Sequence, residues 1–192
     1  MKNVIILGAG GNIAGHVIDI LIKREDIKLT LFLRNVHRLR NKDVSNCRII
    51  EGDVLDLRQL KEAITGQDIV YANLSGDLEG MAKNIVRAMN ENRVKKLIFI
   101  SSIGIYAIPV KPVLQPYRKA ADVIEASGLE YTILRPTWFT GADEVDYETT
   151  RKGEPEKGSV ISQKSLATLI AKIIESPAQF IRENLGVNKP NS

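Results

Sequence analysis

Short apolar runs recur along the chain, and most of them lead directly into glycine or small polar residues. The first run, Val4 to Leu7, is followed at once by Gly8. A short apolar run bounded by turn residues is typical of a strand that is buried on both faces of a sheet. We therefore expect strands over residues 2–7, 28–33, 47–51, 68–72, 96–100 and 129–134.

Apolar residues at helical spacing fill the intervals between these runs. Ile13, Val17 and Leu21 share one face of a helix that is predicted to begin near Asn12. Asp56 and Ser162 precede two further helices and belong to the residue types that cap helix N-termini. The spacing predicts helices over residues 12–23, 57–64, 117–127 and 162–173, and one that contains Met81, Ile85 and Met89.

The succession of strands and helices predicts a doubly wound parallel α/β sheet, with residues 1–192 forming a single domain. The pattern changes after Pro136. Residues 137–160 contain glycines at positions 153 and 158, and we expect loops and a small hairpin there, above a ligand pocket. Residues 183–188 are expected to form a tail that ends the domain.

A glycine-rich turn joins the first predicted strand to the first helix. Gly8 permits a sharp turn off the strand, and glycine at position 10 lacks the Cβ that would hold a pyrophosphate away from the backbone. The free N–H groups at the helix N-terminus favour an anion. This pattern predicts a Rossmann-type dinucleotide site, the alternative being a tight turn in an unrelated α/β protein. The expected contacts are Gly8, Gly10, Gly11, Asn12 and Ile13.

The end of the second predicted strand is positively charged. Arg34 and Asn35 follow the strand, Arg38 lies about one helical turn further on, and the next carboxylate is Asp43. An acidic residue here would bind the ribose 2′-hydroxyl of NAD, whereas an arginine accommodates the 2′-phosphate of NADP. We therefore expect NADP(H) at a site that includes Arg34, Asn35 and Arg38. The alternative is that both arginines are solvated loop charges.

The next two predicted strands end in further candidate cofactor contacts. Asp53 follows the third strand, where its carboxylate can hold the adenine amino group while the backbone of Val54 contacts the ring edge. Asn73, Leu74 and Ser75 follow the fourth strand and lie where the chain would pass beneath the cofactor. Ligands of open α/β sheets bind outside the carboxyl ends of the strands, so we assign all five residues to cofactor binding.

Ser102 and Tyr106 are the candidate catalytic residues. They follow the fifth predicted strand, at the edge of the sheet where the ligands of open α/β sheets bind. Both carry a hydroxyl group that can serve acid chemistry. The alternative is that this serine and this tyrosine stabilise a turn at the end of the strand.

Composition and charge limit the kinds of partner, compartment and covalent cross-link that we expect for this chain. The net charge of +4 comes from lysines and arginines that are spread along the chain, so we expect no nucleic acid partner. No apolar run approaches roughly 18 residues and no leader-like segment is visible, so we expect a cytoplasmic protein without membrane contact. Cys47 is the single cysteine and is expected in the core, so a disulfide within the chain is excluded. We expect no metal, and a monomer or a homodimer.

Several of these motifs occur together in one known family. The chain resembles the atypical short-chain dehydrogenase/reductases, and within them the NmrA-like and flavin-reductase (biliverdin reductase B)-like NAD(P)H-binding groups. The resemblance implies NADP(H) binding, and reduction of a planar acceptor such as a flavin or quinone by direct hydride transfer. It also leaves open a non-catalytic NADP(H) sensor of the NmrA type. The matching segments are residues 8–13, 34–35, 52–54, 101–106 and, most specifically, 127–136.

The chain departs from the catalytic members of this family, which carry a Tyr-x-x-x-Lys pair on one helix face. Here Tyr117 and Lys119 are two residues apart, roughly 200° around a helix, so they cannot form that pair. The segment from Tyr106 to Tyr117 is also shorter than in relatives, either through a deletion or because residues are absent from this sequence. A sugar-nucleotide epimerase is disfavoured, since such enzymes use the pair and a larger C-terminal substrate domain.

Trp138 and Phe139 are the candidate substrate contacts. They follow Arg135 and Pro136, and their rings can form an apolar wall on which a planar acceptor stacks. In the biliverdin-reductase-B-like relatives that the chain resembles, hydride passes directly to such a stacked acceptor and water can supply the proton, so the tyrosine-lysine pair is not required. Ser102 matches the active-site serine of the family. The alternative for the two aromatic residues is a place in the core beneath the loops.

Overall fold

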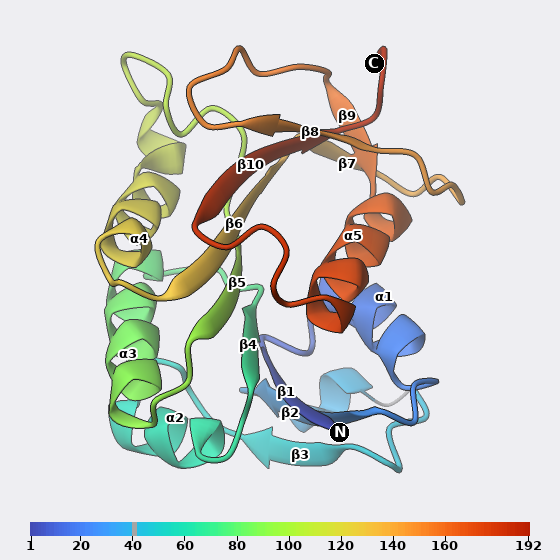
Figure 1. Ribbon diagram of the computed structural model, residues 1–192, viewed down its shortest axis with the longest axis vertical. Coiled ribbons are helices and arrows are strands. Elements are labelled where there is room, and N and C mark those ends of the chain that lie inside the picture. Colours follow the sequence, from blue (N-terminus) through green and yellow to red (C-terminus); the bar gives the residue numbers. More distant parts are fainter. Residues whose placement is uncertain (40–41) are drawn as a thin grey trace.

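The computed structural model describes residues 1–39 and 42–192. Its central sheet contains the strands β1 (Lys2–Leu7), β2 (Ile27–Leu33), β3 (Arg48–Glu51), β4 (Ile69–Ala72), β5 (Lys96–Ile100), β6 (Glu130–Pro136), β8 (Glu148–Arg151) and β10 (Glu183–Asn188). These eight strands run in the order β3-β2-β1-β4-β5-β6-β10-β8 (Figure 1). All neighbours are parallel except β10 and β8, which are antiparallel. The predicted doubly wound α/β fold is confirmed.

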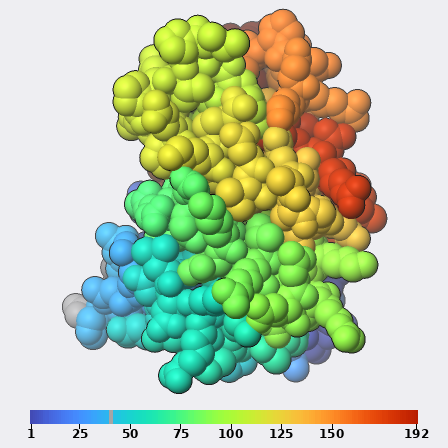
Figure 2. All heavy atoms as spheres, turned by 90° about the vertical axis from the view of Figure 1, so that its left-hand side faces the viewer, coloured from blue at the N-terminus to red at the C-terminus, as the bar shows by residue number. Residues whose placement is uncertain are grey.

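Helices cover both faces of the sheet. One face carries α1 (Asn12–Leu21) and α5 (Gln163–Glu175), and the other carries α2 (Leu57–Ile64), α3 (Leu78–Glu91) and α4 (Gln115–Glu125). The second face is seen in Figure 2, where the cyan, green and yellow atoms of these three helices form one continuous layer. Neighbouring residues of a strand point to opposite layers, as Ile5 and Ile6 do, which explains the continuous apolar runs.

Helix caps fix where several of these helices begin. The Asp56 carboxylate accepts hydrogen bonds of 3.0 Å from the backbone N–H groups of Arg58 and Gln59, and the Ser162 hydroxyl accepts one of 2.9 Å from Ser165. Both caps were predicted and are confirmed. Asp77 caps α3 in the same way through Gly80 N–H. Among the described residues, no side chain caps α1.

Two predictions for the C-terminal third are wrong. The expected tail is the strand β10, which lies between β6 and β8. The expected hairpin is absent from the described residues: β8 pairs with β10, and β7 (Trp138–Thr140) pairs in parallel with β9 (Val160–Ser162). The side chains of Asn184 and Asn188 in β10 are buried and form hydrogen bonds with distant residues. The segment is therefore a buried strand although its sequence is polar.

Smaller corrections concern the links between elements. Cys47 is half-buried and lies one residue before β3, not inside the strand. The chain after β2 forms a short 3₁₀ helix, η1 (Val36–Leu39), and a second one, η2 (Pro112–Leu114), precedes α4. In the part of the chain that the structure describes, no helix has both the length and the apolar character needed to cross a membrane.

Candidate functional site

A cleft of about 350 Å³ opens at the carboxyl ends of β1, β2, β3 and β4. The strand order reverses between β1 and β4, which is where open α/β sheets bind ligands. We call it the glycine-loop cleft. Most of the predicted cofactor residues line it, namely Gly8, Gly10, Gly11, Arg34, Asn35, Arg38, Asp53, Val54, Asn73, Leu74 and Ser75.

A side chain at any of the three glycines of the loop would crowd a neighbouring residue, most severely at Gly8. A Cβ on Gly8 would lie 2.1 Å from the Asn73 carbonyl oxygen, and the φ of +83° disfavours other residues as well. A Cβ on Gly11 would lie 3.1 Å from the Asn73 side-chain nitrogen, and one on Gly10 would lie 2.9 Å from Cδ of Arg38. The bare backbone is therefore open to the close approach of a pyrophosphate, and the loop fits a dinucleotide.

The N-terminus of α1 faces this loop. Gly11 precedes the helix in an extended conformation, and the first turn contains no acidic residue. The first N–H groups of a helix need an acceptor, and an anion is favoured there by the helix dipole. Asn12 is exposed in an adjoining groove with Arg38 and Lys42. The side chain of Ile13 is buried in the core, so only its backbone N–H can serve the predicted cofactor contact.

Two positive side chains stand at the rim of the glycine-loop cleft. Arg34 and Arg38 are both exposed, and no carboxylate of the described residues forms an ion pair with either. The Asn35 side-chain oxygen accepts a hydrogen bond of 3.0 Å from His37 N–H and so starts η1. Both guanidinium groups remain available to a phosphate.

Two side chains that the sequence analysis missed hold the turn after β3. Asn84 of α3 donates hydrogen bonds to the carbonyl oxygens of Val54 and Leu55, at 3.1 and 3.0 Å. Gln59 accepts one of 3.1 Å from Asp53 N–H, and the Asp53 carboxylate accepts one of 2.9 Å from Leu55 N–H. These bonds fix the Asp53–Val54 backbone at the cleft. Asn84 lies on a distant helix, so no local pattern points to it.

A second cleft, of about 450 Å³, opens at the carboxyl ends of β5 and β6. We call it the Trp138 cleft. Ser102 lines it, half-buried, and its hydroxyl donates a hydrogen bond of 3.2 Å to the Ile103 carbonyl oxygen. Trp138 and Phe139 also line it and are 80% and 44% exposed, so a place in the core is wrong for both.

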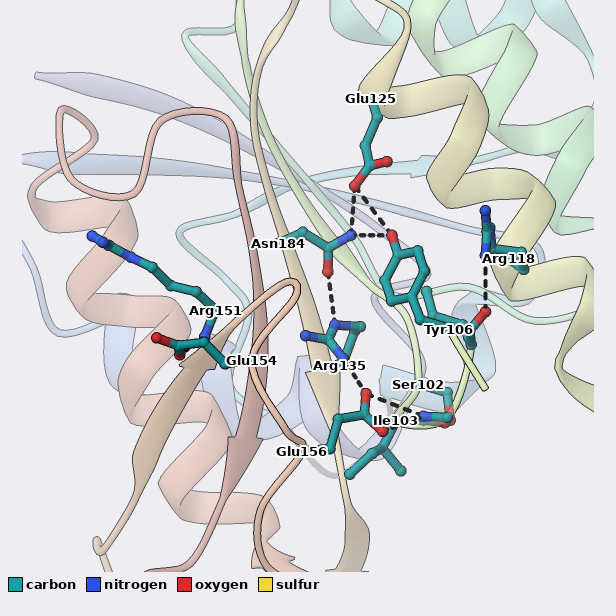
Figure 3. A network of polar contacts seen from close by, with 12 residues as sticks. Ser102, Ile103, Tyr106, Arg118, Glu125, Arg135, Arg151, Glu154, Glu156 and Asn184 are labelled. Carbon is teal, nitrogen blue, oxygen red and sulfur yellow. Dashed lines mark hydrogen bonds and ion pairs between the residues drawn. The ribbon is translucent and has the colours of Figure 1, made fainter. Parts of the chain in front are cut away.

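Tyr106 lies outside the lining of this cleft. Its hydroxyl donates a hydrogen bond of 3.1 Å to Glu125 and accepts one of 2.6 Å from Asn184 (Figure 3). The Arg118 guanidinium and the Lys152 ammonium lie over its ring, 4.7 and 4.5 Å from the centroid. The structure therefore does not bring Ser102 and the Tyr106 hydroxyl together, contrary to the expectation that both serve acid chemistry.

Burial and the neighbouring Glu125 carboxylate make the Tyr106 hydroxyl a weaker acid than a free tyrosine. Burial raises the pKa of its hydroxyl, and the Glu125 carboxylate raises it further. Burial also raises the pKa of the Glu125 carboxyl, but hydrogen bonds from Lys152 and Asn184 outweigh that effect and hold this pKa below its usual value. The Glu125 carboxylate thus holds the Tyr106 hydroxyl as a hydrogen-bond donor, and a catalytic role of Tyr106 stays a prediction.

The short segment between Tyr106 and α4 forms one wall of the Trp138 cleft, through Ala107, Lys111 and Leu114. Tyr117 of α4 lines the same cleft, whereas Lys119 forms an ion pair of 3.2 Å with Glu79 of α3. The two side chains thus have different surroundings, and the absence of a catalytic pair between them stays a prediction. The segment has no regular apolar period, so its part in the cleft could not be predicted from local pattern.

Comparison with known proteins identifies the group of proteins to which this chain is related. Residues 8–177 match the model of the NAD(P)H-binding family. The chain belongs to this family. The match begins at Gly8, which lines the glycine-loop cleft.

Solved structures agree with this assignment. A Rossmann-fold NAD(P)-binding family protein from Shigella flexneri is 51% identical, with a TM-score of 0.94 over 100% of this chain and 95% of that one. A short-chain dehydrogenase/reductase from Veillonella parvula in complex with NADP is 27% identical, with a TM-score of 0.89 over 99% of this chain and 95% of that one.

Curated relatives extend the match to reductases. Cinnamoyl-CoA reductase 1 from Arabidopsis thaliana is 30% identical over 174 residues, which are 82% of this chain and 49% of that protein. The match spans about half the length of this reductase and of a second curated relative, phenylcoumaran benzylic ether reductase PT1 from Pinus taeda. The predicted resemblance to the atypical short-chain dehydrogenase/reductases is confirmed. The assignment to the NmrA-like or flavin-reductase-like group stays a prediction.

Proposed function

We propose that this protein is an NADPH-dependent reductase that transfers hydride to a planar aromatic acceptor of the flavin or quinone class. The observation that carries this proposal is the placement of two clefts along one edge of the sheet. The glycine-loop cleft ends at β4, and the Trp138 cleft begins at the adjacent strand β5. A dinucleotide held in the first cleft can present its nicotinamide end to a molecule in the second.

The residues of the glycine-loop cleft fit NADPH. Arg34 and Arg38 suit the 2′-phosphate, because a guanidinium binds a phosphate through two parallel hydrogen bonds. Gly10, Gly11 and the first turn of α1 suit the pyrophosphate, and Asp53 suits the adenine amino group. The NADP complex of the Veillonella parvula protein supports this choice of cofactor. When bound, NADPH supplies the hydride, and water supplies the proton that completes the reduction.

The Trp138 cleft fits a flat apolar acceptor. The rings of Trp138 and Phe139 are exposed on one wall, and Leu114 faces the cleft from another. Aromatic side chains stack on planar π systems, so these rings would orient the acceptor and exclude water from one of its faces. Ser102 and Lys111 provide polar contacts at the rim. This scheme needs no proton donor from the protein, which is consistent with the position of Lys119.

The second candidate is a non-catalytic NADP(H) sensor of the NmrA type. Lys119 is the observation that favours it, because this lysine pairs with Glu79 and leaves Tyr117 without the lysine of the usual catalytic pair. A sensor would use the glycine-loop cleft in the same way. Unlike the reductase, the sensor would bind NADPH and NADP with unequal affinity and would reduce no acceptor.

Turnover separates the two candidates. The purified chain is mixed with NADPH or NADH and with menadione or FMN, and loss of the reduced nicotinamide absorbance is followed. We expect oxidation of NADPH in preference to NADH. Trp138→Ala should lower kcat/KM for menadione about tenfold, the scale of one lost aromatic contact. Ile181→Ala, an exposed apolar residue outside both clefts, is the control. Tight NADPH binding without turnover of any acceptor would favour the sensor.

A further inference from the structure

An ion pair between a buried arginine and a partly exposed glutamate lies close to the Trp138 cleft and has no part in the roles above. Arg135 of β6 has a side chain that is 2% exposed, and its guanidinium pairs with the Glu156 carboxylate (Figure 3). The guanidinium also donates a hydrogen bond of 2.9 Å to the side-chain oxygen of Asn184. Among the described residues, Glu156 is the one carboxylate that pairs with Arg135. A buried cation requires an anionic partner, so Glu156 is strongly held in this position.

The same carboxylate also contacts the wall of the cleft. The backbone N–H of Gly104 donates hydrogen bonds of 3.1 and 3.4 Å to the two oxygens of Glu156. Gly104 lines the Trp138 cleft together with Ser102 and has a φ of +83°, a conformation that suits glycine. Glu156 therefore links a buried charge to the backbone turn that carries Ser102.

The segment that contains Glu156 touches the opposite wall as well. Residues 152–159 are exposed and join β8 to β9. At the end of this segment, Trp138 N–H donates a hydrogen bond of 3.2 Å to the Ser159 carbonyl oxygen. One exposed segment thus connects the Gly104 wall and the Trp138 wall, and the ion pair of Glu156 with Arg135 anchors it to the core.

We propose that Glu156 is a positioning residue for the acceptor. Arg135 orients the Glu156 carboxylate, and the carboxylate fixes the backbone turn of residues 102–104. The segment that carries Glu156 also bonds to Trp138 N–H, so it sets the spacing between Trp138 and that turn. This inference rests on the proposed role of the Trp138 cleft in acceptor binding. It concerns the fit of the acceptor and makes no demand on the glycine-loop cleft.

The test uses binding, which does not depend on turnover. Trp138 is the single tryptophan of the chain, so quenching of its fluorescence by menadione reports on acceptor binding in the cleft. Glu156→Ala removes both contacts of the carboxylate, and Glu156→Gln keeps an acceptor for Gly104 N–H while it removes the charge. Glu154→Gln is the matched control, because Glu154 lies in the same segment and accepts a hydrogen bond of 2.9 Å from Arg151 N–H.

We expect Glu156→Ala to weaken menadione binding about tenfold, the scale of a lost charge-assisted hydrogen bond, and Glu156→Gln to weaken it less. Glu154→Gln should match the wild type, and NADPH binding should be equal in all four proteins. Acetate should restore menadione affinity to Glu156→Ala by placing a carboxylate beside Arg135, and sodium chloride at equal ionic strength should not. A loss of loop structure alone would show no such rescue.

Two results would overturn the inference: equal menadione affinity in Glu156→Ala and the wild type, or rescue by acetate that is no better than by chloride. If Glu156→Ala does not fold, the menadione affinity of Glu156→Gln is compared with that of Glu154→Gln, and equal affinities overturn the inference. Failure of the proposed reductase function would give a different combination of results. In that case NADPH is not oxidised by the wild type, while the Glu156 variants still change the quenching of Trp138 by menadione.

Discussion

Arg34 and Arg38 give the glycine-loop cleft its positive rim. Both follow β2, both are exposed, and the side chain of Arg38 packs against Gly10. Their location could be predicted from the sequence, because the position after the second strand of this fold faces the ribose of the cofactor. The proposed preference for NADPH depends on these single side chains, so point substitutions test it.

Arg34→Asp is expected to weaken NADPH binding by about 1–3 kcal/mol, the scale of a lost charge-assisted hydrogen bond. NADH lacks the 2′-phosphate, so its affinity should change much less. Titration calorimetry with both cofactors measures the difference. Arg58→Asp makes the same charge change at an exposed position of α2 outside the cleft and should leave NADPH affinity unaltered. An unaltered NADPH affinity in Arg34→Asp would mean that the cofactor preference is assigned wrongly.

Lys96 is a buried lysine whose charge the fold tolerates poorly. Its ammonium donates hydrogen bonds to the Thr132 hydroxyl at 3.0 Å and to the Gln179 carbonyl oxygen at 3.1 Å. Burial lowers its pKa from 10.5 to about 8, against the opposing effect of Glu130. Between these values the unfolded chain holds a proton that the folded chain has released, so the free energy of unfolding rises with pH.

The wild type should therefore gain stability relative to Lys96→Met as the pH rises from 8 towards 10.5. At about 1.4 kcal/mol for each pKa unit, the gain is at most about 3.5 kcal/mol. Urea unfolding of both proteins at several pH values measures it, and the other titrating groups cancel in the difference. A difference that is constant over this range would show that burial does not lower the pKa of Lys96.

At the scale of elements, the turn between β1 and α1 decides whether the cofactor site forms. Gly8→Ala places a residue with a side chain at a φ of +83°, as Gly66→Ala does at a φ of +74°. This conformation costs about 1–2 kcal/mol in either variant. Only at Gly8 does the new Cβ also meet Asn73, at 2.1 Å from its carbonyl oxygen, whereas Gly66 has open space around it.

Gly8→Ala should therefore lose more unfolding free energy than Gly66→Ala and should also lose NADPH binding. Denaturant unfolding and a cofactor titration of both variants give the two quantities. Equal stability and equal NADPH affinity in the two variants would show that the contact between Gly8 and Asn73 has no role in the site.

Local patterns predicted most of the elements but not the C-terminal strands. The strands β1 to β6 carry their own apolar runs, and Asp56 and Ser162 mark helix starts by their chemistry. β10 has the sequence Glu-Asn-Leu-Gly-Val-Asn, whose asparagines and glycine are rare in strands. Its stability comes from its neighbours: β6 and β8 supply the backbone pairing, and Tyr106, Glu125 and Glu148 satisfy the buried asparagines.

At the scale of the whole molecule, the two clefts differ in how far the sequence reveals them. The glycine-loop cleft is built from residues that directly follow strands, so knowledge of the strands places them at one edge. The Trp138 cleft takes its walls from segments far apart in the chain, including Lys111, Tyr117 and the anchor residue Glu156. Long-range contacts such as that of Glu156 with Arg135 depend on the fold as a whole, so no local pattern predicts them.

If the two clefts hold cofactor and acceptor in direct contact, hydride passes from one defined face of the nicotinamide. Single-turnover reduction of menadione with NADPH deuterated at C4 on one face of the ring or on the other measures this. A fixed orientation across the two clefts predicts slower reduction with one of the two deuterated forms and an unchanged rate with the other. Failure of both forms to react, or equal rates with both, would contradict direct hydride transfer at this site.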